Sequence, residues 1–188
     1  MPIRIAINGF GRIGRNILRS SWDRDDVEVV HVNDRNETGM LSYLLHRDSV
    51  HGTWGTHVEH VDGGISIDGK VISATRKSDP LELPWADLGV DVVLECTGAF
   101  TQREGAALHL QAGARKVLIS APGKGVDCTV VYGVNHKSYD PSAHDVVSNA
   151  SCTTNCLAPL VKVLNETCGI EHGLVTTVHS YTLSQNLL

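Results

Sequence analysis

The chain has 188 residues, of which 41 % are hydrophobic and 20 % charged, and its formal net charge is −5. A negative net charge argues against nonspecific nucleic-acid binding, because no cationic field attracts phosphates, and no apolar run is long enough to span a bilayer. The five cysteines are sparse and odd in number, and the N-terminus does not read as a secretory signal, so we expect a reduced, cytoplasmic compartment.

The first elements in the chain predict a βαβ unit. Ile3–Asn8 is a short apolar run with β-branched residues, Gly11–Trp22 carries apolar residues close to helical spacing, and Val27–Val32 is a second strand. Two strands joined by a helix of this length predict a parallel pair with a right-handed crossover.

The alternation of strands and helices continues to about residue 150. The further predicted elements are a helix over Thr38–His46, hairpins over Val58–Ile72, a buried strand over Val90–Glu95, a helix over Arg103–Ala112, and strands over Lys116–Ser120, Thr129–Tyr132 and Val146–Ser148. This pattern is typical of a doubly wound parallel sheet, so we predict one α/β domain of the Rossmann type over residues 1–150.

A different organisation begins after Asn149. Ser151–Glu166 predicts a helix, in which Pro159 should cause a kink or shorten the first turn, and Gly173–His179 predicts a strand. One helix and one strand cannot enclose a core. We therefore expect residues 151–188 to be the N-terminal fragment of a second domain.

Three glycines point to a dinucleotide. Gly9, Gly11 and Gly14 form G-x-G-x-x-G directly after the first strand, and Asp34 lies 20 residues beyond Gly14. The glycines allow a tight turn, a close approach of the backbone to a pyrophosphate, and close packing of helix and strand. A carboxylate after the second strand binds ribose hydroxyls and repels a 2′-phosphate, which favours NAD over NADP, although Arg35 is adjacent.

Further polar residues follow later strands. Thr97 and Gly98 come after one predicted strand and Ser120 ends another. Because ligands of open α/β sheets lie beyond the carboxyl ends of the strands, these residues are candidates for the same crevice. On position alone, ordinary loop residues are an equally good interpretation.

Cys152 lies at the predicted start of the second-domain helix, where the helix dipole and free N–H groups stabilise a thiolate. His179, at the end of the following strand, is a candidate base. On spacing alone, a buried structural cysteine remains an alternative.

Cys156 lies one turn further along the same helix. A single C-x3-C is weak evidence for a zinc site and favours a packed or redox-linked thiol, so we predict no metal site. The cysteines without an identified base are interpreted as structural: Cys96, Cys128 and Cys168. A group of histidines is interpreted as surface residues: His51, His57 and His60.

At these residues the chain resembles the phosphorylating glyceraldehyde-3-phosphate dehydrogenase family. The motifs INGFGRIGR (Ile7–Arg15), NASCTTNCLAP (Asn149–Pro159) and TTVHSYT (Thr176–Thr182) carry the resemblance, which extends over essentially the whole chain. It implies that residues 151–188 begin an α+β catalytic domain, and that the chain is the N-terminal part of a longer, homotetrameric enzyme.

The resemblance also implies a mechanism. The Cys152 thiolate attacks the aldehyde of glyceraldehyde 3-phosphate, His179 activates the thiol and accepts the hydroxyl proton, NAD takes the hydride, and inorganic phosphate cleaves the thioester to give 1,3-bisphosphoglycerate. The cofactor-binding residues implied by the match are Gly9, Gly11, Arg12, Ile13, Gly14, Asp34, Ser78, Thr97, Gly98 and Ser120. The substrate-binding residues implied by it are Ser151, Thr153 and Thr182.

Two alternatives stay open. Erythrose-4-phosphate dehydrogenase shares the fold, the cysteine and the histidine, and an NAD-binding module without turnover would need only the first domain.

The sequence also departs from the family at Leu183-Ser184-Gln185, where an amide and a carboxylate are usual after His-Ser-Tyr-Thr.

Overall fold

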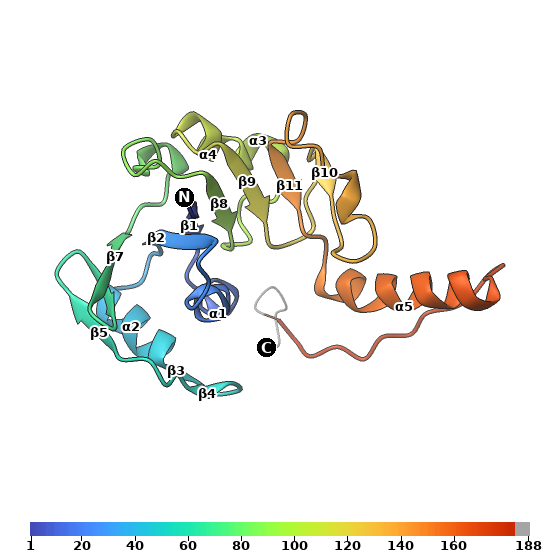
Figure 1. The fold of residues 1–188 in the computed structure, drawn as a ribbon, viewed down its shortest axis with the longest axis horizontal. Helices are drawn as coiled ribbons and strands as arrows, with labels where there is room; N and C mark the ends of the chain where they lie inside the picture. Colours follow the sequence, from blue (N-terminus) through green and yellow to red (C-terminus); the bar gives the residue numbers. More distant parts are fainter. Residues whose placement is uncertain (183–188) are drawn as a thin grey trace.

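The computed structural model describes residues 1–182, and its central feature is one large twisted sheet (Figure 1). Within those residues, nine strands join in the order β10-β11-β9-β8-β1-β2-β7-β6-β5. Their bounds are β1 Ile3–Asn8, β2 Val27–Asn33, β5 Val58–Val61, β6 Gly64–Ile67, β7 Lys70–Thr75, β8 Val92–Glu95, β9 Lys116–Ile119, β10 Cys128–Thr129 and β11 Val146–Ser148. Two further short strands, β3 (Arg47–Asp48) and β4 (Gly52–Thr53), form a separate antiparallel pair.

The strand order confirms a doubly wound sheet. All neighbouring pairs from β10 to β7 are parallel, while β7, β6 and β5 form the predicted antiparallel hairpins. The chain runs outward from β1 through β2 to β7, and then returns to the other side of β1 with β8, β9 and β11. The order therefore reverses between β1 and β8, the position at which ligands bind in sheets of this type.

Helices cover both faces of the sheet (Figure 1). On one face lie α1 (Arg12–Ser21) and α2 (Thr38–His46), and on the other α3 (Arg103–Ala106), α4 (Leu108–Gln111) and the 3-10 helix η1 (Pro80–Glu82). Successive side chains of a strand point to opposite faces of the sheet, so the strands contribute to two hydrophobic cores. On one face Ile7 and Leu94 pack with Leu18 of α1, and on the other Ala6 and Val93 pack with Trp85. Both faces of these strands are therefore buried, as their nearly continuous apolar sequences predict.

Several predicted elements differ in detail. The helix over Arg103–Ala112 divides at Ala107, whose N–H bonds the carbonyls of both Arg103 and Gly105 in a tightened turn. The strand predicted over Thr129–Tyr132 is instead the two-residue β10. These shifts leave the topology unchanged, because the parallel pairings are set by longer strands.

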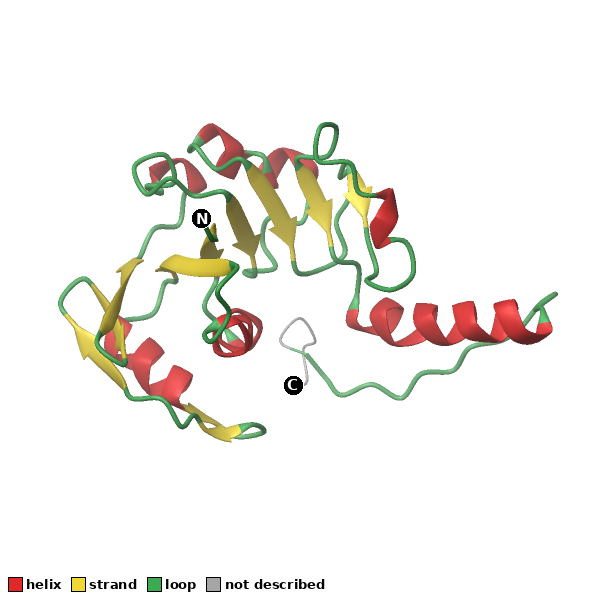
Figure 2. Ribbon diagram, in the orientation of Figure 1, coloured by secondary structure: helices red, strands yellow, loops and turns green. Residues whose placement is uncertain are grey.

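After the last strand comes a long helix, α5 (Cys152–Cys168), which leaves the sheet beyond β11 (Figure 2). It continues through Pro159 to Cys168, so the proline does not end it. The following chain turns and runs back along the helix toward its start (Figure 1). The strand predicted over Gly173–His179 is wrong for the described structure: this segment pairs with no strand within residues 1–182 and lies exposed. A strand requires a neighbour for its backbone groups.

Among residues 1–182, the structure has no helix of the length and apolar character that crossing a membrane requires.

Candidate nucleotide and thiol site

The predicted site residues collect at one edge of the sheet. Because neighbouring parallel strands end at the same edge, the segments that follow them lie side by side. The residues that follow these strand ends are Gly9 after β1, Asp34 after β2, Ser78 after β7, Thr97 and Gly98 after β8, Ser120 after β9, and Cys152 after β11.

The three glycines have different physical roles. Gly9 has φ +91°, and a Cβ there would lie 2.6 Å from the Thr97 backbone nitrogen. A Cβ on Gly14 would press against the Gly9 carbonyl and lie 2.9 Å from Ile7 Cγ2. A Cβ on Gly11 would meet no atom within 4 Å. Gly9 and Gly14 are thus required by packing, whereas Gly11 leaves open space beside the backbone, which fits a pyrophosphate.

The first turn of α1 is suited to an anion. Arg12 and Ile13 are its first residues, and among the described residues no side chain caps its N-terminus. The leading N–H groups of a helix have no partner within the helix, and the dipole favours negative charge there. The Arg12 guanidinium itself turns to Asp48, 3.2 Å from both carboxylate oxygens. This contact is not predictable from a local sequence pattern, since 36 residues separate Arg12 from Asp48.

Asp34 is fixed beside the glycine turn. Its Oδ2 accepts a hydrogen bond of 2.8 Å from the Phe10 N–H, and its Oδ1 accepts from the backbone and side-chain amides of Asn36 at 2.9 and 2.8 Å. Each carboxylate oxygen accepts about two hydrogen bonds. Asp34 therefore keeps acceptor capacity for a ribose hydroxyl while its orientation is set by the protein.

Ser78 and Thr97 lie on opposite sides of the glycine turn along this edge. Ser78 is exposed and follows Lys77, whose backbone exchanges two hydrogen bonds of 2.9 Å with the Asn33 side chain. On the other side of β1, the Thr97 N–H and hydroxyl both donate to Glu95 Oε1, and Gly98 has φ +74°. The glycine turn lies between these two segments.

Ser120 belongs to the β9 end of the site. Its N–H donates to the Glu95 carbonyl at 3.0 Å, and its side chain hydrogen-bonds Cys96. Burial raises the pKa of the Cys96 thiol to about 11, in spite of that hydrogen bond. Cys96 is half-buried and packs against the core, which agrees with its interpretation as a structural cysteine.

The turn before α5 presents Cys152. Ala150 adopts φ 57°, a left-handed conformation that costs a residue with a Cβ about 1–2 kcal/mol. Ser151 then caps the helix by accepting a 2.9 Å hydrogen bond from the Thr154 N–H. Cys152 is consequently the first helical residue, exposed, with its sulfur near the positive end of the helix dipole.

His179 contacts that sulfur. Its Nε2 lies 3.0 Å from Cys152 Sγ, and its Nδ1 donates to the Ser180 carbonyl. The hydrogen bond to His179 lowers the pKa of Cys152; desolvation opposes it, and the hydrogen bond from the Thr153 N–H adds to the lowering. The Ser180 carbonyl and the Cys152 sulfur raise the pKa of His179. Both shifts favour a thiolate–imidazolium pair, which is a nucleophile beside an acid.

The predicted substrate residues flank this pair. Ser151 precedes Cys152, Thr153 follows it, and Thr182 lies three residues beyond His179 in the exposed segment. The Ser151 hydroxyl also accepts the hydrogen bond from the Thr154 N–H that caps α5. The departure at Leu183-Ser184-Gln185 lies outside the described residues.

The remaining cysteines and histidines show no comparable arrangement. Cys156 and Cys168 are exposed and Cys128 is half-buried. The interpretation of Cys168 as a buried structural cysteine is therefore wrong for the described chain, and of the two interpretations of Cys156 the packed one does not hold there. The histidines predicted at the surface are exposed: His51, His57 and His60. Within residues 1–182 no cluster of three His, Cys, Asp or Glu side chains is placed to hold a metal ion.

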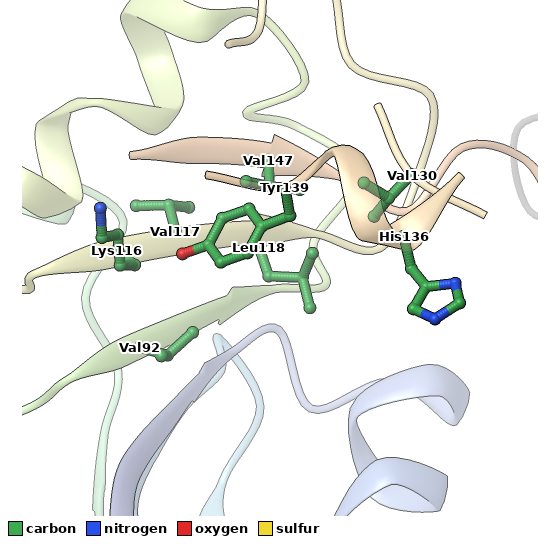
Figure 3. A pocket seen from close by; sticks show the side chains of 8 residues that line it. All are labelled: Val92, Lys116, Val117, Leu118, Val130, His136, Tyr139 and Val147. Atoms are coloured by element: carbon green, nitrogen blue, oxygen red, sulfur yellow. The ribbon is translucent and has the colours of Figure 1, made fainter. Parts of the chain in front are cut away.

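A separate cavity of about 280 Å³ lies against strands β8, β9 and β11 (Figure 3). Val92, Leu118 and Val147 of β8, β9 and β11 line it together with Tyr139 and His136. None of the predicted site residues contributes to its lining. It is apolar, and the chemistry described above lies elsewhere.

Comparison with known proteins places these features in one family. Residues 3–103 match the family model for the NAD binding domain of glyceraldehyde 3-phosphate dehydrogenase, and residues 151–188 match the model for its C-terminal domain. The chain is similar to glyceraldehyde-3-phosphate dehydrogenases of Pseudomonas aeruginosa (56 % identity) and Geobacillus stearothermophilus (53 % identity). Each match covers 100 % of the chain but only 57 % and 56 % of the respective relative.

Proposed function

The chain belongs to the glyceraldehyde-3-phosphate dehydrogenase family, and from this premise we propose that it supplies the NAD site and the nucleophile of a phosphorylating aldehyde dehydrogenase. The substrates are glyceraldehyde 3-phosphate and inorganic phosphate, and the product is 1,3-bisphosphoglycerate. The observation that carries the proposal is the 3.0 Å contact between Cys152 Sγ and His179 Nε2, on the helix that follows a strand of the nucleotide-binding sheet.

The thiolate begins the reaction. Cys152 Sγ attacks the aldehyde carbon, and the imidazolium of His179 gives its Nε2 proton to the oxygen, which forms a hemithioacetal. His179 is then a neutral base and takes that hydroxyl proton back as the carbon is oxidised. When bound, NAD supplies the hydride acceptor. The resulting thioester on Cys152 is cleaved by phosphate, and the thiolate leaves.

The proposed cofactor residues follow from their places at the sheet edge. The backbone of Arg12 and Ile13 binds the pyrophosphate above Gly9, Gly11 and Gly14, and Asp34 binds the adenosine ribose. Ser78 lies on the adenosine side, while the segments on the nicotinamide side are Thr97, Gly98 and Ser120.

The proposed substrate residues are those around the thiol. Ser151, Thr153 and Thr182 contact the aldehyde substrate or phosphate, supported by their positions next to Cys152 and His179. Hydroxyls and a helix N-terminus together are suited to phosphate groups. The homotetramer, the cytoplasmic location and the domain boundary at residue 150 stay predictions.

One observation favours a second candidate for the chain at this length. No residue of α5 is fully buried, and the segment that carries His179 is exposed. With so few contacts around them, the Cys152 and His179 side chains are not held in one fixed geometry for turnover. The 188-residue chain would then bind NAD on the sheet without catalysis at Cys152.

An assay of NAD reduction tests these proposals. The 188-residue chain and one extended to the length of its relatives are each given glyceraldehyde 3-phosphate or erythrose 4-phosphate, with and without inorganic phosphate. Phosphate-dependent turnover of the triose supports the proposed function. Preference for erythrose 4-phosphate, or NAD binding without turnover in both chains, contradicts it.

A matched pair of substitutions identifies the nucleophile. Cys152→Ser removes the proposed thiolate, and Cys156→Ser removes the thiol one turn further along the same helix. We expect Cys152→Ser to abolish formation of the acyl-enzyme and to preserve NAD affinity, and Cys156→Ser to retain acylation. Acylation that survives Cys152→Ser would rule out this residue as the nucleophile.

A further inference from the structure

Four neighbouring strands end in buried or half-buried polar side chains that lie in one row across the sheet. Asn8 of β1 is directly opposite Glu95 of β8 on one side and Asn33 of β2 on the other, and Asn33 is opposite Thr75 of β7. Glu95, Asn8 and Asn33 are 1 %, 2 % and 4 % exposed. We call these four residues the polar row.

Hydrogen bonds connect the polar row from end to end. Asn8 Nδ2 donates to Glu95 Oε2 at 2.6 Å, Asn33 Nδ2 donates to Asn8 Oδ1 at 2.7 Å, and the Thr75 hydroxyl donates to Asn33 Oδ1 at 2.9 Å. Each amide thus has its oxygen and nitrogen directions fixed by its neighbours. Buried polar networks that are fully satisfied in this way hold one geometry.

His109 of α4 completes the Glu95 end of the polar row. The Trp85 indole can only donate, and it lies 3.0 Å from His109 Nδ1, so Nδ1 accepts and Nε2 carries the hydrogen. That hydrogen goes to Glu95 Oε2 at 3.0 Å. Asn8 Nδ2, 3.4 Å from the same Nε2, is therefore a second donor to Glu95 rather than a partner of the imidazole.

Glu95 accordingly receives donors on both oxygens. Oε2 accepts from Asn8 and His109, and Oε1 accepts from the N–H and the hydroxyl of Thr97. A carboxylate satisfies this set because it only accepts. An amide of the same shape would place two hydrogens against two of these donors, so the site discriminates between Glu and Gln.

The polar row lies directly beneath the segments assigned to the cofactor. Its Glu95 end holds the Thr97 turn, Asn8 immediately precedes Gly9, and the Asn33 side chain holds the backbone of Lys77 next to Ser78. None of the four residues has a role in the proposed reaction or a proposed contact with the cofactor. Each lies one to three residues from a segment that we propose to contact the dinucleotide.

We propose that Glu95 is a positioning residue of the NAD site: through the polar row it sets the Thr97–Gly98 turn against the glycine turn, and so fixes the nicotinamide half of the cofactor. This inference rests on the proposed NAD function. It assigns a role to Glu95, His109 and Asn8 that does not require them to touch the cofactor.

The test compares two ligands that share the adenosine half. AMP lacks everything beyond one phosphate, so it reports on the Asp34 side, whereas NAD also reaches the Thr97 side. By titration calorimetry on the intact chain, we expect Glu95→Gln to weaken NAD binding about tenfold or more and AMP binding less than about twofold. A merely structural role for Glu95 would lower both affinities together.

Two further variants keep the test decisive. Asp127→Asn is the matched control, because Asp127 also accepts from a side chain and from backbone N–H groups, but lies before β10 at the opposite edge of the sheet. It should change neither affinity by more than about twofold. Thr97→Val removes the hydroxyl that donates to Glu95 and accepts from the Ala99 N–H, and should weaken NAD binding several-fold with AMP binding retained.

The outcomes separate cleanly. An equal loss for NAD and AMP in Glu95→Gln, or no loss of NAD affinity, overturns the inference. If circular dichroism shows that Glu95→Gln is unfolded, Thr97→Val decides, and unchanged NAD affinity there overturns it. Failure of the unsubstituted chain to bind either nucleotide overturns the NAD function itself and this inference with it.

Discussion

The two halves of the proposed site are held in very different ways. The nucleotide half lies on a sheet packed on both faces, with Phe10, Leu18 and Trp85 fully buried. The thiol half lies at the start of α5, where Leu160 and Leu164 are 59 % and 54 % exposed. The position of the cofactor site is therefore set by the packed core of the sheet. The position of the Cys152 sulfur depends instead on the N-terminus of α5, the strained turn at Ala150 and one contact with His179.

The largest contrast between the two regions should appear in stability. Leu18→Ala removes a side chain from the core and should lower the free energy of unfolding by about 2–5 kcal/mol. Leu164→Ala removes an exposed side chain and should change it by less than about 0.5 kcal/mol. Urea denaturation of both variants measures this, and equal losses would show that α5 belongs to the same packed unit.

The glycine turn offers a second comparison, within the nucleotide half. Gly9→Ala places a methyl group 2.6–2.8 Å from the backbone of Cys96 and Thr97 at a positive φ, and should cost about 2 kcal/mol or more of stability. Gly11→Ala meets no protein atom within 4 Å, so the fold should be retained while NAD affinity falls about tenfold or more.

Thermal unfolding and NAD titration separate the two glycine effects. Normal NAD affinity in Gly11→Ala would contradict the placement of the pyrophosphate beside this residue.

The nucleotide half should also respond to acid through His31. Burial lowers the pKa of His31 to about 4, against 6.5 for an exposed histidine. Between these values the unfolded chain binds a proton that the folded chain does not, so stability falls as the pH drops from about 6.5 to about 4. The loss amounts to at most about 3 kcal/mol.

His31→Gln tests that pH dependence. The variant should show a smaller loss of stability between pH 6.5 and 4, in urea denaturation at several pH values. At pH 8 the histidine is neutral in the folded and the unfolded chain. The difference in free energy of unfolding between His31→Gln and the unsubstituted chain at that pH therefore gives the effect of changing the hydrogen bonds to Ser73 and Thr75. An unchanged pH slope would contradict the burial of a neutral imidazole.

The sequence predicts the nucleotide half well because its signals are local. Strand periodicity, the glycine spacing and Asp34 all lie within the first 35 residues, and the structure forms the βαβ unit over nearly the predicted bounds. The Cys152 helix start is similarly local, since Ser151 is a good N-cap. The contact with His179 was a hypothesis, because spacing along a chain gives no distance.

Long-range polar contacts escaped prediction. Asn8 and Glu95 are 87 residues apart, and His109 was assigned only to a helix. A signal was present in hindsight: β1, β2 and β8 are apolar runs that each end in a polar residue, Asn8, Asn33 and Glu95. The strand prediction at Gly173–His179 is wrong for a different reason. The local apolar pattern is typical of a strand, but the segment has no strand to pair with in the described chain.

The most direct test of the central claim is the rate of Cys152 alkylation by iodoacetamide as a function of pH, with mass spectrometry to assign the modified cysteine. His179 lowers the pKa of Cys152, so the rate should reach its half-maximum at a lower pH than for an ordinary thiol. His179→Ala should shift that midpoint upward. A Cys152 profile that matches an ordinary thiol and is unaffected by His179→Ala would contradict the thiolate–imidazolium pair on which the proposed chemistry depends.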